Sequence, residues 1–292
     1  GRGHAAAAHP TAPLAVAFAR RPGAFALVID CAEGRETHRL QAPEGRHFYG
    51  HGVFLDGGRL LVTTENDIAS GAGRLGIWDL EDGFIRLDEV PSGGIGPHEV
   101  VRLPGDILAV ANGGIRTHPA TGRDKLNLET MRPNLAYLQD GALIDMVEPA
   151  QHHLSIRHLA ARTDGTVAMA IQWQGDPDAD VPLLAIHRRG AAMEMRGADL
   201  ARDMRGYAGS VAWSGSGNTV AITGPRGGLA AIWEGGDLRL LRRPDICGVA
   251  PTAEGLAFTD GLGGVLTDLG TRRHMVAWDN HLVPLGFDPT QQ

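Results

Sequence analysis

The sequence predicts an all-β protein: a seven-bladed β-propeller whose last blade is closed by the C-terminal strand, with a six-bladed ring as the alternative. Two observations support this fold. Apolar runs of about 5 to 8 residues, bounded by Gly and Asp, recur along the chain. They fall into groups of four whose starts, at residues 4, 51, 98, 158, 210, 247 and 281, are about 46 residues apart, as in propeller blades. We therefore expect a single propeller domain over residues 1–292.

The second repeat shows the four-strand unit most clearly. Its runs are Gly50–Leu55, Arg59–Thr64, Arg74–Leu80 and Ile85–Val90, and the turn Asp56-Gly57-Gly58 separates the first two. Val, Ile, Leu, Thr and Trp are common in these runs, and such residues favour strands. Each run is therefore predicted to be one strand of a blade.

The other repeats follow the same order. They cover residues 4–41, 98–147, 157–196, 210–241 and 247–278, and the third carries a long polar insertion, Gly113–Pro133. His274–Trp278 is predicted as the fourth strand of the sixth repeat, and Asn280–Leu285 as the inner strand of a seventh blade. The outer strands of that blade are expected to precede Gly1. Ala198–Met204 predicts a short helical turn between blades.

Composition excludes several classes of partner. The net charge is −7 and the basic residues are scattered, so nucleic acid is not an expected partner. No run approaches the roughly 18 apolar residues of a membrane-spanning helix. Cys31 and Cys247 are too far apart in sequence for a short zinc or redox motif, and Cys31 is expected to be a small buried residue.

Five histidines open the first run of a repeat: His4, His51, His98, His158 and His281. In a blade the second strand returns to the face on which the first strand began, so first-strand starts and second-strand ends share one rim. Imidazoles gathered there suit iron or copper, with zinc also possible, because each offers a neutral nitrogen donor. The pattern therefore predicts a transition-metal site, although each histidine could instead be a hydrogen-bonded residue that ties neighbouring blades together.

Other polar groups are predicted on the same rim. Cys247 would be a soft metal ligand, or a small residue that allows close approach. Carboxylate and amide groups at second-strand ends could accept the second imidazole N–H and fix its tautomer; they are Glu65, Asn66, Asn112 and Asp260. Arg157 and Arg226 could hold an anionic co-ligand, and the loop around His118 could fold over the channel as a lid.

Several long motifs together resemble one bacterial family, the uncharacterised propeller family known as the domain of unknown function fifteen-thirteen. They are Arg46–Gly52, Thr63–Asp67, Gly94–Glu99, Ala111–Ile115 with Thr117–Pro119, Leu126–Leu128, Ser155–Leu159, Pro225–Gly228 and Trp278–Leu282. The resemblance covers almost the whole chain. It implies an exported periplasmic protein, often with a twin-arginine signal, associated with imelysin-like iron-uptake proteins and a haem-containing partner. The signal and the N-terminal strands expected of the family are absent from this sequence.

Three functions follow as hypotheses. The first is a periplasmic propeller that binds iron or copper through the histidines, as a free ion or a metal complex, and serves metal acquisition. The second is a metal-dependent enzyme of redox or lactonase type, in which Glu65, Asn112 and Asp260 would form an oxygen-rich site. The third is a protein-interaction scaffold. The sequence favours a role other than catalysis and identifies no catalytic residue.

Overall fold

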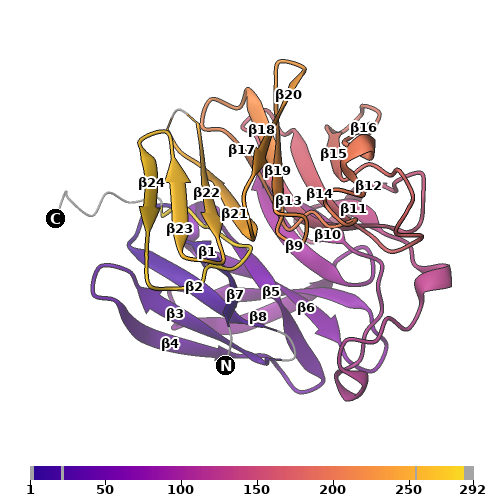
Figure 1. Cartoon of the computed structure of the whole chain (residues 1–292). Helices are drawn as coiled ribbons and strands as arrows, with labels where there is room; N and C mark the ends of the chain where they lie inside the picture. Colours follow the sequence, from indigo (N-terminus) through magenta and orange to yellow (C-terminus); the bar gives the residue numbers. More distant parts are fainter. Residues whose placement is uncertain (1–2, 21–22, 254, 286–292) are drawn as a thin grey trace. The chain divides into compact units, whose positions relative to one another are not determined.

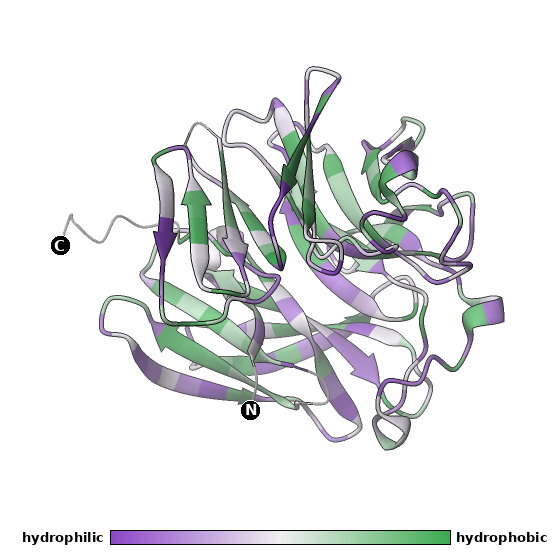
Figure 2. Cartoon of the chain, in the orientation of Figure 1, coloured by the Kyte–Doolittle hydropathy of each residue, from purple (hydrophilic) through white to green (hydrophobic). Residues whose placement is uncertain are grey.

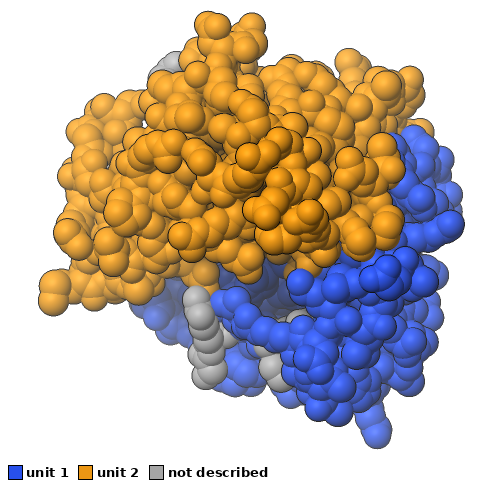
Figure 3. Space-filling view, turned by 45° about the vertical axis from the view of Figure 1, so that its right-hand side comes forward, with its two compact units in different colours: residues 1–148, 283–292 blue, residues 149–282 orange. Residues whose placement is uncertain are grey.

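The computed structural model describes residues 3–20, 23–253 and 255–285. Over this part of the chain, 24 strands form six four-stranded antiparallel sheets, each made of four consecutive strands (Figure 1). Two compact units contain three sheets each (Figure 3). Unit 1 is residues Gly1–Glu148 with Val283–Gln292, and unit 2 is Pro149–Leu282. None of the described helices is long and apolar enough to cross a membrane.

The three sheets of unit 1 match the first three predicted repeats. Their strands are β1 (Gly3–Ala8), β2 (Leu14–Ala19), β3 (Phe25–Asp30) and β4 (Arg35–Gln41); β5 (Arg46–Leu55), β6 (Leu60–Asp67), β7 (Gly73–Asp79) and β8 (Ile85–Pro91); and β9 (Pro97–Leu103), β10 (Ile107–Asn112), β11 (Asn134–Gln139) and β12 (Ala142–Val147). The 3-10 turn η1 (Asp56–Gly58) lies in the second sheet, and the insertion contains η2 (Pro119–Thr121) and η3 (Leu128–Thr130).

Unit 2 repeats this arrangement. Its strands are β13 (Leu154–Ala161), β14 (Val167–Trp173), β15 (Leu184–His187) and β16 (Glu194–Arg196); β17 (Ser210–Trp213), β18 (Thr219–Gly224), β19 (Leu229–Glu234) and β20 (Asp237–Arg242); and β21 (Ile246–Pro251), β22 (Leu256–Asp260), β23 (Gly264–Thr267) and β24 (Gly270–Arg273). The predicted turn near residue 198 is the 3-10 turn η4 (Ala198–Leu200).

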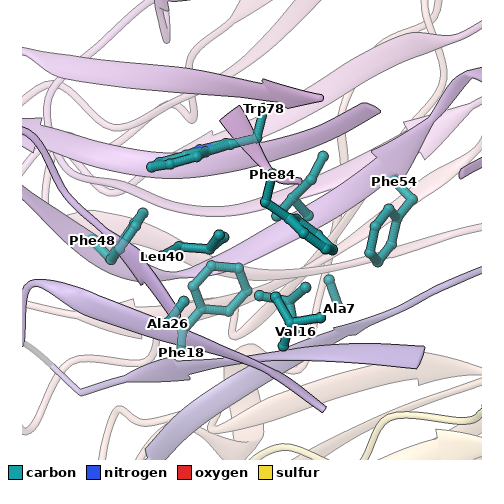
Figure 4. Close-up of a cluster of buried hydrophobic side chains, with 11 residues drawn as sticks. Ala7, Val16, Phe18, Ala26, Leu40, Phe48, Phe54, Trp78 and Phe84 are labelled. Carbon is teal, nitrogen blue, oxygen red and sulfur yellow. The ribbon is translucent and has the colours of Figure 1, made fainter. Parts of the chain in front are cut away.

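Apolar side chains fill the space between successive sheets. In unit 1, Phe18 from β2, Phe48 from β5 and Trp78 from β7 belong to one buried cluster (Figure 4). The fourth strands face solvent, and Figure 2 shows hydrophilic residues on β4 and β24. Because neighbouring sheets pack face to face, their first strands lie side by side: β1 beside β5 and β5 beside β9 in unit 1, β13 beside β17 and β17 beside β21 in unit 2.

The seven-bladed prediction is wrong, and its six-bladed alternative is correct. The predicted seventh inner strand, Asn280–Leu285, forms no strand, and it contains Pro284, which cannot donate a ladder hydrogen bond. The predicted strand His274–Trp278 is also irregular. Gly270, with a φ of 117°, starts β24 after a turn of only two residues, so the sixth sheet is complete before His274. Of the seven predicted blade starts, six begin a sheet in the described part of the chain, and the start at residue 281 does not.

Candidate metal site

A break in strand pairing recurs near the start of the first strand in five of the six described sheets. The pairing register shifts between Gly3 and Ala6 in β1, Phe48 and Gly52 in β5, Pro97 and Glu99 in β9, Ile156 and His158 in β13, and Ile246 and Val249 in β21. Such bulges redirect side chains and are common beside functional sites. The predicted histidines of β1, β5, β9 and β13 all lie within or at the edge of a bulge.

Unit 1 brings together three of the five predicted histidines. The ring centres of His4 and His51 are 5.0 Å apart, those of His51 and His98 also 5.0 Å, and those of His4 and His98 5.5 Å. A ring nitrogen of His51 lies within 4.8 Å of one on His4, and likewise of one on His98. His51 and His98 are buried and His4 is half-buried. The cluster follows directly from the side-by-side packing of β1, β5 and β9.

A glycine in β5 makes room for this cluster. Gly50 has a φ of 106°, and a Cβ at this position would overlap the imidazole of His4. Both the backbone conformation and the close approach therefore require glycine. The absence of a side chain at Gly50 therefore leaves room for the imidazole of His4 in the cluster.

The ring-centre spacing resembles that of imidazoles around one metal ion, and donor nitrogens lie within 4.8 Å of each other in the pairs His4–His51 and His51–His98. An imidazole bound at about 2.1 Å through nitrogen has its ring centre about 3.2 Å from the ion, so tetrahedral angles place ring centres about 5.2 Å apart. The three observed separations, 5.0, 5.0 and 5.5 Å, bracket this value. Three neutral nitrogen donors suit copper, zinc or iron.

Glu99 lies beside the cluster and is not among the site residues predicted from the sequence. Its carboxylate Oε1 lies 3.5 Å from Nδ1 of His51. Metal-bound histidines commonly present their other ring nitrogen to a carboxylate, which fixes the tautomer and makes the imidazole a better donor. The signal in the sequence was the acidic residue directly after His98, but only the packing of β9 against β5 shows which histidine it serves.

Unit 2 brings together the other two histidines. His158, buried on β13, has its ring centre 4.8 Å from that of His281. His281 lies in an irregular segment, not at a strand start. This segment packs over the start of β21, because a Cβ on Gly248 would lie 3.3 Å from Cβ of Leu282.

Glu65 and Asn66 are buried in the second sheet and have partners there. Glu65 accepts hydrogen bonds from Arg86 Nη2 at 2.6 Å and from Thr63 Oγ1 at 2.8 Å. Burial raises the pKa of Glu65, and the attraction of Arg86 offsets this rise only in part. Asn66 Nδ2 lies 3.4 Å from Nε2 of His47, which is not one of the five predicted ligands.

Asn112 serves the packing of the third sheet. Its Nδ2 donates to the Ser92 carbonyl and to Asn134 Oδ1, both at 2.9 Å, and its Oδ1 accepts from Ser92 Oγ at 2.7 Å. The amide is thus committed to the segment that precedes β9. The nearby His118 accepts a hydrogen bond from the Ala120 amide and caps η2 within the insertion.

In unit 2, Asp260 forms an ion pair with Arg243 and accepts backbone hydrogen bonds from Leu262 at 2.9 Å and Gly264 at 2.8 Å. Burial opposes its ionisation, but the Gly264 amide and Arg243 together hold the pKa of Asp260 below its ordinary value. Cys247 is buried with Sγ 3.5 Å from the Thr259 carbonyl, and burial raises the pKa of its thiol. A protonated thiol is a poor metal ligand.

The two predicted anion-binding arginines lie in different surroundings. Arg157 precedes His158 on β13 and is half-buried. Arg226 is exposed, and its guanidinium lies 4.1 Å from the centre of the Tyr207 ring. Both arginines lie on the side of unit 2 on which first strands begin and second strands end. Arg157 is in the first half of the first strand β13, and Arg226 follows the end of the second strand β18.

Comparison with known proteins identifies a family and supports the fold. A family profile described as "protein of unknown function (DUF1513)" matches residues 1–285. No curated protein sequence matches the chain. Similar solved structures include Kuenenia stuttgartiensis hydrazine synthase, with a TM-score of 0.70, 11% identity, and coverage of 94% of this chain and 84% of that chain.

Two further structures are similar. Kluyveromyces lactis Hsv2 has a TM-score of 0.53 and 10% identity over 90% of this chain and 72% of that chain. A complex of KlAtg21 with the coiled coil of AgAtg16 has a TM-score of 0.61 and 10% identity over 91% and 80%. These likenesses support a β-propeller and, at such identities, nothing about activity.

Proposed function

We propose that this chain, which belongs to the DUF1513 family of proteins of unknown function, binds a transition-metal ion through His4, His51 and His98 and serves metal acquisition. The observation that supports this proposal is the spacing of the three imidazoles, which are supplied by three adjacent first strands. Glu99 at His51 supplies the outer partner that such sites commonly use.

The donor set restricts the metal. Three neutral imidazoles favour copper, zinc or ferrous iron over calcium and magnesium, which prefer oxygen ligands. Iron and copper are our proposed cargo, and the preference for iron rests on the family resemblance. The periplasmic location and the delivery of metal to imelysin-like or haem-containing proteins belong to the same proposal and have the same basis.

An oxygen-rich site of lactonase type receives less support. Glu65, Asn112 and Asp260 lie on β6, β10 and β22, and each is engaged by partners of its own: Arg86, Ser92 with Asn134, and Arg243. Using them as metal ligands would require breaking these buried interactions.

Metal titration of the purified full chain tests the proposal. After chelation, elemental analysis and calorimetry with Cu(II), Zn(II) and anaerobic Fe(II) should show stoichiometric binding. The double variant His51→Ala with His98→Ala should lose at least about 100-fold in affinity, because two of three protein ligands are gone. His38→Ala, on the exposed strand β4, is the matched control and should bind like wild type. Stoichiometric binding that survives in the double variant would overturn the proposal.

A further inference from the structure

The segment 274–282, here called the strap, ends unit 2 without forming a helix or strand. Unit 2 ends at Leu282, and the next residue, Val283, belongs to unit 1. The strap therefore leads into one of the two places where the chain passes from one unit to the other. Three of its apolar residues are exposed to solvent. Met275 is fully exposed, and the exposed fractions of Val276 and Trp278 are 49% and 37%. Hydrophobic packing of these residues is therefore not what holds the strap in place.

A few specific contacts attach the strap instead. The His274 amide donates to the Gly263 carbonyl at 2.8 Å, and Asn280 Nδ2 donates to the Tyr207 hydroxyl at 3.1 Å. Leu282 packs against the glycine at the start of β21, as described above. Beyond these, the strap places His281 against His158 on β13.

We propose that His158 and His281 form a metal-operated latch, in which one ion coordinated by both imidazoles fastens the strap to β13. This inference rests on the proposed metal binding. The ring centres are 4.8 Å apart, and two imidazoles bound at about 2.1 Å with a ligand–metal–ligand angle near 100° have ring centres about 4.9 Å apart.

The latch explains why the first-strand pattern changes in unit 2. The first strands of the fifth and sixth sheets begin at Ser210 and at Ile246 with Cys247 and Gly248, and none of these residues is a histidine. A side chain at Gly248 would meet Thr259 Oγ1 at 2.5 Å and Leu282 of the strap at 3.3 Å, and the strap brings His281 in place of a strand-borne imidazole. A donor on an irregular segment moves more readily than one on a strand, so binding and strap order are coupled.

Hydrogen exchange measured by mass spectrometry tests the latch in the full chain, with Zn(II) as a redox-inert probe. Zinc should slow exchange of peptides covering residues 274–282 at least about ten-fold in wild type. His281→Gln and His158→Ala should abolish this protection. His274→Ala, in the same strap but paired with the Trp278 ring at 5.8 Å, is the matched control and should keep it.

The outcomes separate the latch from the proposed function. Wild-type protein that binds zinc without protecting the strap overturns the latch alone, as does equal protection in wild type and His281→Gln. Absence of zinc binding in wild type overturns the latch, and absence of copper and iron binding as well overturns the proposed function. Unchanged exchange in β18 and β19 of each variant shows that unit 2 remains folded, so that loss of protection in the strap reports the latch itself.

Discussion

The carboxylate of Glu99 lies 3.5 Å from Nδ1 of His51, although the two residues come from first strands of different sheets. In the proposed site, His51 would therefore bind the ion through Nε2. We expect Glu99→Gln to weaken metal binding about ten-fold and Glu99→Ala to weaken it further, because loss of an outer carboxylate lowers the basicity and order of the ligand. Calorimetric titration measures the change.

The structure offers a matched control for this prediction. Glu129 is exposed in the insertion, so Glu129→Gln removes the same charge away from the histidines and should leave affinity unchanged. Imidazole nitrogen NMR adds a second readout, because the tautomer of His51 should become mixed in Glu99→Ala and be restored in part by Gln. Equal affinity of all the variants would show that Glu99 does not position His51.

Gly50 provides a second test of the site. Gly50→Ala places a methyl group against the His4 ring at a positive φ, so we expect a loss of about 3 kcal/mol in the free energy of unfolding together with weaker metal binding. Gly57→Ala shares the positive φ, 65°, but has open space around its Cβ. It should cost only about 1 kcal/mol and leave metal binding intact. Denaturant unfolding and metal titration compare the two.

Equal behaviour of the two glycine variants would contradict the role of Gly50 in the site. Similar losses in stability with unchanged metal affinity would mean that only backbone strain matters. A metal defect in Gly57→Ala would point to a general loss of structure. The two variants thus distinguish the space that Gly50 leaves for the His4 ring from the backbone strain that a positive φ imposes on alanine.

The sequence predicts most of the fold because strand patterns and repeat spacing are local properties. The predicted strand Ile85–Val90 is observed as β8 (Ile85–Pro91), and His98 is the second residue of β9, whereas His51 lies in the middle of β5, which begins at Arg46. The final repeat fails because His274–Trp278 is a short apolar run like those of the strands, although its apolar residues face solvent. Because β24 already starts at Gly270, the four strands of the sixth sheet are complete before His274. The residues of His274–Trp278 themselves give no sign of this.

The candidate site also combines features that the sequence predicts with features that only the structure reveals. Adjacent blades bring His4, His51 and His98 together, as the repeat spacing predicts. Glu65 stands at a second-strand end, but its side chain pairs with Arg86, a partner 21 residues away that strand periodicity does not identify. His281 reaches His158 from an irregular strap. Side-chain direction and long-range pairing therefore had to come from the structure.

The buried pair of Glu65 and Arg86 gives a stability prediction with a defined pH dependence. Arg86→Met leaves the Glu65 carboxylate, which is 0% exposed, without its cation and should cost about 3 kcal/mol at pH 7.5. Burial already raises the pKa of Glu65 above its unfolded value, and loss of Arg86 raises it further. A raised carboxyl pKa favours the folded state at low pH, so the defect should shrink as pH falls towards the unfolded pKa of Glu65.

Thermal and denaturant unfolding between pH 7.5 and 5 measure this effect. Arg39→Met breaks the exposed pair with Glu36 on β4 and should cost less than about 1 kcal/mol at either pH. A defect in Arg86→Met that stays constant or grows on acidification would show that Arg86 stabilises the fold by packing on Trp78, over which its guanidinium lies, and not through Glu65.

Cys247 allows a direct choice between a metal ligand and a packing residue. Its thiol is buried, its pKa is raised by burial, and Sγ lies beside Thr259. We therefore expect Cys247→Ala to change metal affinity less than about two-fold and to cost about 1 kcal/mol of stability.

Chemical modification gives a second readout of the two thiols. In the native protein a disulfide reagent should modify the half-buried Cys31 first and Cys247 at least about ten-fold more slowly. Because a raised pKa delays thiolate formation, the slow reaction should accelerate only at high pH. A large loss of metal affinity in Cys247→Ala with unchanged stability would instead make Cys247 a ligand.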